Sequence, residues 1–165
     1  MNAGRPRSIR SIGTASLALA VLAIVIGGTY WIGRSGGAVT LRPDSASMVA
    51  QGQAVYSREC ASCHGAQLEG QPNWRQQGSD GVLPAPPHDA TGHTWHHSDD
   101  LLFRIVKYGT AKAANLPDYR SGMPVYEVRL SDEEIVAALS YIKSRWPPQV
   151  RARHDEMNRA AAASR

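Results

Sequence analysis

The sequence is poor in cysteine and in large aromatic side chains. Its 165 residues include two cysteines and one phenylalanine, against 15 glycines and 10 prolines. The hydrophobic content is 42%, but part of it lies in one N-terminal run. Two cysteines exclude a framework of several disulfides. A domain of about 100 residues with so little apolar material needs something else to fill its centre.

The middle of the chain also lacks a basic excess. The formal net charge is +4, yet residues 46–148 carry nine basic and eleven acidic side chains. The basic excess lies in residues 1–45 and 149–165 instead. Because a nucleic-acid binder needs a basic patch on its folded surface, we expect no nucleic-acid partner.

One long uncharged segment lies near the N-terminus. Arg5, Arg7 and Arg10 precede 23 residues without charge, from Ser11 to Gly33. As a helix this segment would be about 34 Å long, against roughly 30 Å of hydrocarbon in a bilayer. The arginines before the segment outnumber Arg34 just after it, which predicts a cytoplasmic N-terminus and a following domain on the outer side.

Three interpretations of this segment stay open. Tyr30 and Trp31 lie where an interfacial aromatic belt would be, which favours a retained single-pass anchor over residues 1–34. The most apolar stretch, residues 17–26, also has the length of a signal-peptide core, and small residues follow that would permit cleavage. A buried helix of a soluble domain is the third interpretation. We favour the anchor, and with it the lipid bilayer as a partner.

Capping residues and apolar side chains at helical spacing predict three helices, which cover residues 45–60, 98–108 and 131–146. Ser45 or Ser47 caps the first, and Ser131 with Glu134 forms a capping box on the third. The segments between the helices show neither helical nor strand periodicity. About thirty residues of loop inside a compact domain indicate that the loop wraps something.

These elements define four parts of the chain. Residues 1–34 are the anchor or uncleaved signal, and residues 35–45 read as a short linker. Residues 46–148 form the folded domain. Residues 149–165 are rich in Arg and Ala and show no stripe that faces a core, so we expect this tail to be disordered or peripheral.

Cys60-Ala61-Ser62-Cys63-His64 is the strongest chemical motif. C-x-x-C-H is the pattern of a c-type haem attachment site. Two thiols one helical turn apart each add to one vinyl group of haem, and the adjacent imidazole reaches the iron from the same side. One covalently attached haem c would also fill the lean core and give the long loop a group to wrap.

Two other uses of the cysteines stay open. A redox dithiol also has C-x-x-C spacing, but it usually lies near a βαβ pattern, and no parallel strands are visible here. A structural zinc site needs four ligands. Cys60 and Cys63 would share it with one or two loop histidines out of His88, His93, His96 and His97. The predicted export segment and the three helices favour haem.

Met123 is the favoured second axial ligand of the iron. It lies about sixty residues beyond His64, in a loop ahead of the last helix, and so reaches the opposite face. Gly122 and Pro124 flank it, whereas a methionine that fills a core usually lies on a helix. A His–Met pair raises the reduction potential. Ligation by a second histidine and an open sixth position are the alternatives.

Residues 47–146 resemble the class I cytochromes c, of a bacterial membrane-anchored type. The matching pieces are Gly52 with Tyr56, Cys60 to Gly65, Pro86-Pro87, Gly122-Met123-Pro124, and Ala138 with Tyr141. The resemblance implies a small all-α fold wrapped around one covalent haem, with His64 and Met123 as axial ligands. It also implies that the first and last helices cross at their small residues.

The resemblance assigns further residues around the haem. The carbonyl of Pro87, with Pro86 as the next choice, is expected to accept a hydrogen bond from His64 and fix its ring. Trp95 and Arg120 are candidates to hydrogen-bond the haem propionates, although a packed aromatic ring and a solvated arginine are equally ordinary roles for them.

The histidines between positions 88 and 97 also invite a copper or zinc interpretation. We favour loop side chains that face solvent beside the haem edge.

The function implied is that of a monohaem electron carrier rather than an enzyme, because both axial positions are filled. We expect it on the outer, periplasmic face of the cytoplasmic membrane, as a respiratory-chain carrier or as the electron-transfer subunit of an oxidase or dehydrogenase. The expected partners are membrane oxidases, dehydrogenases or other cytochromes. Two alternatives remain: a haem sensor or peroxidase-like protein with a displaceable sixth ligand, and a metal-handling protein that uses the histidines.

Overall fold

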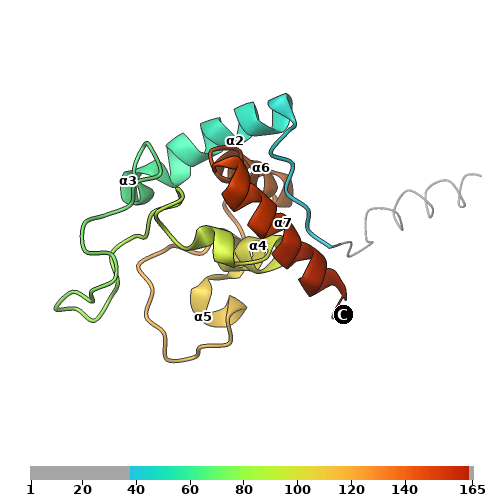
Figure 1. The fold of residues 1–165 in the computed structure, drawn as a ribbon. Helices are drawn as coiled ribbons and strands as arrows, with labels where there is room; N and C mark the ends of the chain where they lie inside the picture. The colour runs from blue at the N-terminus through green and yellow to red at the C-terminus, as the bar shows by residue number, and fades with distance from the viewer. Residues whose placement is uncertain (1–37, 164–165) are drawn as a thin grey trace, which may run out of the picture. The chain divides into compact units, whose positions relative to one another are not determined.

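Short helices joined by long loops make up residues 38–163, which are the residues described by the structure, a computed structural model. In chain order the helices are α2 (Ala46–Glu59), α3 (Ala61–His64), the 3-10 helix η1 (Thr94–His96), α4 (Asp99–Tyr108), α5 (Thr110–Ala113), α6 (Asp132–Ser144) and α7 (Pro148–Ala163). No strand occurs within residues 38–163 (Figure 1), and the prediction of an all-α fold is confirmed for this part of the chain.

Each of the three predicted helices begins at a predicted cap. The side chains of Ser45, Ser98 and Ser131 accept hydrogen bonds from backbone N–H groups in the first turns of α2, α4 and α6. In α6 the Glu134 carboxylate also accepts from the Ser131 N–H, at 3.0 Å, which completes the capping box. At the other end of α4, Gly109 adopts φ +85°. These ends follow from local side-chain chemistry.

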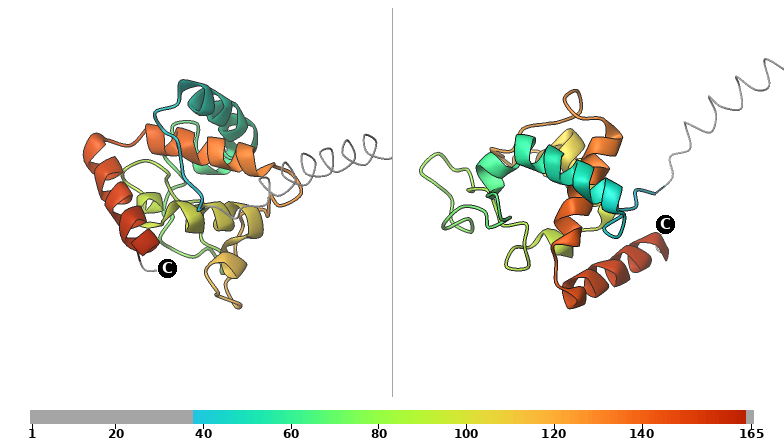
Figure 2. Two further views of the ribbon diagram at one scale, coloured as in Figure 1. Left: turned by 90° about the vertical axis from the view of Figure 1, so that its right-hand side faces the viewer. Right: turned by 90° about the horizontal axis from the view of Figure 1, so that it is seen from above.

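Helices α2 and α6 cross at Gly52 (Figure 2). A Cβ at this position would lie 1.9 Å from the carbonyl oxygen of Ala137, so only glycine permits the approach. Beside the crossing, the rings of Tyr56 and Tyr141 pack with their centroids 5.5 Å apart. The predicted crossing of the first and last helices of the domain is confirmed, with the backbone of Ala137 rather than Ala138 at the closest point.

The apolar core lies around this crossing. Its buried members come mainly from α2, α4 and α6, and include Val55, Tyr56, Leu102, Phe103, Ile135, Leu139 and Ile142. Trp146, just after α6, belongs to the same cluster. The stripe that the sequence predicts for the last helix of the domain is therefore the face that points into the core.

The tail, expected to be disordered or peripheral, is peripheral and not disordered over the described residues: it belongs to the helix α7, which lies along the outside of the domain in the views of Figures 1 and 2. His154 is fully buried, and its Nε2 donates to the carbonyl of His97 at 3.0 Å. Asn158, one turn later, donates to the Asp99 carboxylate at 3.0 Å. Polar side chains attach α7 to the domain, so the sequence of α7 lacks the apolar stripe that predicts a packed helix.

Long loops occupy the rest of the described chain. Residues 65–93 contain no helix, and part of this loop extends from the helical body in Figures 1 and 2. The predicted loop over residues 110–130 contains one short helix, α5, which the sequence analysis missed. The predicted anchor over residues 1–34 lies outside the described residues. Among residues 38–163, no helix is both long enough and apolar enough to cross a membrane.

Candidate functional site

The C-x-x-C-H motif spans the junction of α2 and α3. The Cys60 N–H closes α2 by donating to the Tyr56 carbonyl at 2.9 Å, and α3 carries the motif through His64. Cys63 is exposed, Cys60 is half-buried, and no disulfide joins them. His64 is buried, with 7% of its surface exposed. A single short turn thus presents two thiols beside one buried imidazole.

Burial and the Glu59 carboxylate raise the pKa of the Cys60 thiol to about 11. Cysteines of reactive dithiols have a lowered pKa instead, because the thiolate is the nucleophile. The environment of Cys60 therefore argues against the redox-dithiol interpretation.

The His64 ring is oriented by a backbone carbonyl on the facing loop. Its Nδ1 lies 2.8 Å from the carbonyl oxygen of Pro86. A carbonyl only accepts, so Nδ1 carries the proton and Nε2 keeps its lone pair for a metal. Burial lowers the pKa of His64, against the opposing effect of this hydrogen bond, and a lowered pKa keeps the ring neutral.

The acceptor is Pro86, so the expectation that Pro87 would fill this role is wrong, and the second choice is correct. The Pro87 carbonyl instead accepts a hydrogen bond from the Thr94 hydroxyl at 3.4 Å. Two consecutive prolines place their carbonyls in different directions, and spacing in the sequence does not tell which one meets the ring. The tertiary placement of the loop decides it.

Two glycines make room for this proline segment. A Cβ at Gly70 would lie 2.4 Å from the Pro87 nitrogen, and one at Gly92 would lie 2.0 Å from the Pro87 oxygen. Gly70 also has φ +68° and donates its N–H to the His64 carbonyl at 2.8 Å. The loop is therefore closely packed against the motif on both sides.

His88, which we expected to face solvent, packs inward instead. Its ring stacks on that of His64, with centroids 4.0 Å apart and planes 23° from parallel. Its Nδ1 is hydrogen-bonded to the Thr94 hydroxyl at 2.8 Å. Burial, with His64 and His93 nearby, lowers the pKa of His88 well below its ordinary value. The only signal in the sequence was its position directly after Pro86-Pro87.

The remaining loop histidines, His93, His96 and His97, do not form a metal centre with His88. His93 stacks on Trp74 at 5.2 Å, His96 stacks on Trp95 at 3.7 Å, and His97 meets the edge of His93. Within residues 38–163, no group of three or more His, Cys, Asp or Glu side chains is arranged to hold a metal ion. This part of the chain supports neither the zinc interpretation nor the copper one.

Trp95 has an unpaired donor. Among residues 38–163, its Nε1 is the one buried side-chain nitrogen or oxygen without a hydrogen-bond partner. A buried N–H without a partner costs about 1–3 kcal/mol, so it indicates an acceptor supplied from outside the polypeptide. This supports the prediction that Trp95 binds a haem propionate.

Arg120 and Met123 lie on the loop before α6. The Arg120 side chain is exposed, and one of its nitrogens donates to the carbonyl of Asp80 at 2.8 Å, so the structure gives it a backbone partner. Met123 is half-buried and packs against the core. Its N–H donates to the Ser121 hydroxyl at 3.1 Å. Their roles as propionate donor and axial ligand stay predictions.

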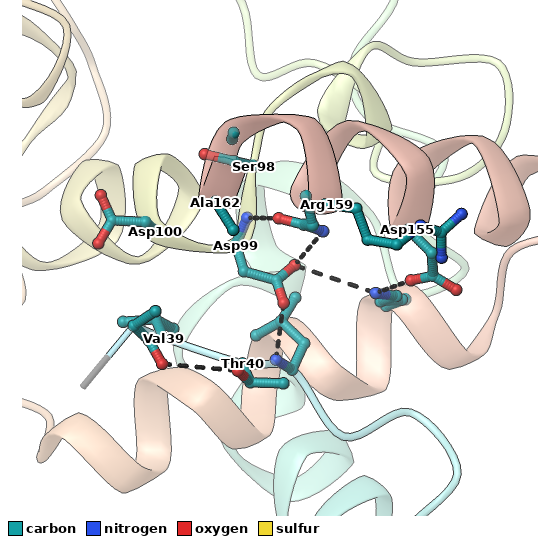
Figure 3. A pocket seen from close by; sticks show the side chains of 13 residues that line it. Val39, Thr40, Ser98, Asp99, Asp100, Asp155, Arg159 and Ala162 are labelled. Atoms are coloured by element: carbon teal, nitrogen blue, oxygen red, sulfur yellow. Dashed lines mark hydrogen bonds and ion pairs between the residues drawn. The ribbon is translucent and has the colours of Figure 1, made fainter. Parts of the chain in front are cut away.

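A second polar cluster lies where α7 meets α4 and α6, and Figure 3 shows Asp99 at its centre. The Asp99 carboxylate accepts from the Leu41 N–H at 2.8 Å and from the Asn158 amide. Lys143, buried beside it, pairs with Asp155 at 2.6 Å. Because the buried polar groups of this cluster bind one another, we assign it to the stability of the fold.

Comparison with known proteins agrees with this geometry. The family model described as cytochrome c matches residues 49–146, more than half of the chain. No curated protein and no solved structure matches the chain. This chain belongs to the cytochrome c family. It carries haem c, attached through Cys60 and Cys63, and it is a haem-based electron carrier.

The residues fit that cofactor. The motif offers two thiols for the vinyl groups and a neutral imidazole whose Nε2 is available to iron. The unpaired Trp95 donor suits a carboxylate. The thiols and the imidazole come from one motif and the Trp95 donor from another segment, and each suits a different part of a haem.

Proposed function

We propose that this cytochrome transfers single electrons between redox proteins on the outer, periplasmic face of the cytoplasmic membrane, with residues 1–34 as its anchor. The observation that carries the electron-transfer role is the hydrogen bond from His64 Nδ1 to Pro86. It fixes the ring and leaves Nε2 for iron, which is the arrangement of a permanent axial ligand.

The bound haem supplies a one-electron couple, and the protein determines its potential through ligand identity, burial and hydrogen bonds. In this proposal His64 and Met123 are the residues that would hold the haem iron. Trp95 and Arg120 donate to the propionates. With both axial positions filled, no iron site is left for a substrate, so the protein acts as a carrier and not as a catalyst.

The location rests on the sequence of the N-terminal segment. Three arginines precede its 23 uncharged residues, which favours an outward-facing haem domain. A tether of this kind keeps the domain at a high effective concentration near membrane proteins. We therefore propose a membrane oxidase, a dehydrogenase or another cytochrome as the partner, with the chain as a respiratory carrier or as a subunit of such a complex.

Visible spectra of the chain matured with haem c test the axial ligands. We expect a sharp reduced α-band, a weak long-wavelength ferric band from the methionine ligand, and no change on adding carbon monoxide. Met123→Ala should abolish the ferric band, open the sixth position to carbon monoxide and lower the potential. Met157→Ala, in α7, is the matched control and should change none of these properties.

Two outcomes would contradict the proposal. An unchanged spectrum in Met123→Ala would remove methionine as the ligand. Rapid binding of carbon monoxide to the unmodified reduced protein would favour the sensor or peroxidase-like alternative. For the location, the full chain should stay with membranes through an alkaline wash and a chain without residues 1–34 should not; release of both would exclude the anchor.

A further inference from the structure

We infer that His88 is a positioning residue for His64: its ring lies against the face of that imidazole, fixes the plane of the ring, keeps water from it, and thereby raises the reduction potential. The inference deepens the proposed function and rests on it, because it concerns the proposed iron ligand. His88 itself touches the ligand only, so its effect passes through His64.

The contact supplies a restraint that His64 otherwise lacks. The covalent bond at Cγ, the hydrogen bond at Nδ1 and a metal at Nε2 all hold the imidazole at atoms in its own plane, and none of them contacts the face of the ring. The stack with His88, at 4.0 Å and 23°, is a contact with the face of the ring. It opposes tilting of the ring towards His88 and so stiffens the orientation that the in-plane contacts set.

His88 is held firmly enough to act as this support. Its N–H donates to the Leu68 carbonyl at 2.8 Å, and its carbonyl accepts from Trp146 Nε1 at 2.7 Å. The ring is fixed in turn by the Thr94 hydroxyl, and Thr94 is only 5% exposed. Three separate hydrogen bonds therefore determine where the ring lies and how it is turned.

The same packing excludes water from the ligand. The rings of Tyr56 and His88 meet edge to face, with centroids 6.3 Å apart, so three rings pack together on this side of the motif. Oxidised iron carries one more positive charge than reduced iron, and nearby water stabilises the more highly charged form. A dry, ordered ligand therefore favours reduction, which is the effect of burial on haem potentials.

Redox titration of variants matured with haem c tests the inference. His88→Ala removes the supporting ring, and we expect the equilibrium constant for reduction to fall about tenfold, which is a shift of 59 mV for one electron. His88→Phe keeps a flat ring and should keep most of the potential. Thr94→Val leaves the His88 ring in place without its hydroxyl partner and should give an intermediate shift.

Low-spin ferric electron paramagnetic resonance supplies a second readout that depends on the plane of the axial ring. We expect a broadened or shifted signal in His88→Ala and Thr94→Val. His93→Ala is the matched control, since it removes a histidine ring of the same loop that stacks on Trp74 and not on His64. It should leave the potential and the signal unchanged.

The inference is overturned if His88→Ala keeps the potential and the resonance signal of the parent protein. Should His88→Ala fail to mature, His88→Leu and Thr94→Val decide in the same way, because both preserve side-chain bulk. Failure of the proposed function looks different. There the parent protein would itself lack a reversible one-electron couple or would bind carbon monoxide.

Discussion

Two polar clusters of this cytochrome differ in where their partners come from. Among the groups assigned to haem, which we take as the first cluster, His64 keeps one ring nitrogen for iron and Trp95 Nε1 has no partner within the chain. Around Asp99, the carboxylate and the ring of His154 bind other groups of the chain. The first cluster is built for a group from outside the polypeptide. In the second cluster, the polar side chains are hydrogen-bonded to other groups of the chain.

The two clusters also differ in their relation to the family. The motif cluster lies within the matched residues 49–146. The Asp99 cluster adds groups from both sides of that range, Leu41 before it and α7 after it. Arg42 is held in a similar way, since its N–H donates to the Ser140 hydroxyl at 2.9 Å. The segments on either side of the matched range are thus attached to the domain by hydrogen bonds to α4 and α6.

The largest loss of stability should come from preventing the attachment of haem at the first cluster. The Cys60→Ala/Cys63→Ala chain has no site for covalent haem, and it keeps both the lean core and the unpaired Trp95 donor. We expect it to lose the cooperative unfolding transition, since a bound group stabilises only the folded state. Calorimetry and circular dichroism on this chain and the haem protein make the comparison. Equal melting temperatures would contradict this prediction.

Breaking the second cluster should destabilise the fold without altering the haem. Asp99→Ala deprives the Leu41 N–H and the Asn158 amide of their acceptor and leaves Lys143, 4% exposed, with Asp155 alone. We expect a loss of about 3 kcal/mol in the free energy of unfolding. Chemical denaturation measures it, and the visible spectrum should not change.

Asp100→Ala is the matched control for that substitution. Asp100 is the next residue, but it pairs with Arg104 at the surface, one helical turn away. Its loss should cost about 0.5 kcal/mol or less. Equal destabilisation by the two substitutions would show that burial of the Asp99 cluster is not what stabilises the fold.

The smallest effect should appear in the dependence of stability on pH. Burial and the Lys143 ammonium lower the pKa of His154, despite the opposing Asp99 carboxylate. The folded protein therefore holds this ring neutral, while the unfolded chain protonates it below about pH 6.5. The contribution of His154 is present above that pH and is lost as the pH falls through and below it.

His154→Gln should therefore flatten the decline of the unfolding free energy between pH 7 and 5. Denaturant titrations at several pH values measure this decline, with the visible spectrum as a check that the haem ligands stay in place. An identical slope in the parent and the variant would remove His154 as a source of the pH dependence.

The parts of the fold that were predicted correctly depend on local chemistry. Ser45, Ser98 and Ser131 each bind a backbone group within three residues, so the sequence around them is sufficient to identify helix starts. Gly52 indicated that a second helix approaches closely, because a glycine on a buried stripe has few other uses. The attachment motif is likewise contained in five consecutive residues.

The parts that were missed depend on contacts between distant residues. His64 and Pro86 are 22 positions apart, and Asp99 and Asn158 are 59 apart. No periodicity links such pairs. Helix α7 was missed for the same reason, since its attachment depends on partners that lie in other helices and not on an apolar stripe of its own.

By itself, the sequence determined the three capped helices and the covalent attachment of haem c, because each is encoded within a few neighbouring residues, and the resemblance that its motifs carry implied the all-α class. Only the tertiary structure decided which proline carbonyl orients His64, that His88 stacks on it, and that α7 is attached through Asp99 and His154. The physical reason is that a hydrogen bond or a ring contact across a long loop depends on how the whole loop packs. A sequence motif shows which functional groups are present, and the packing of the fold determines which of these groups come into contact.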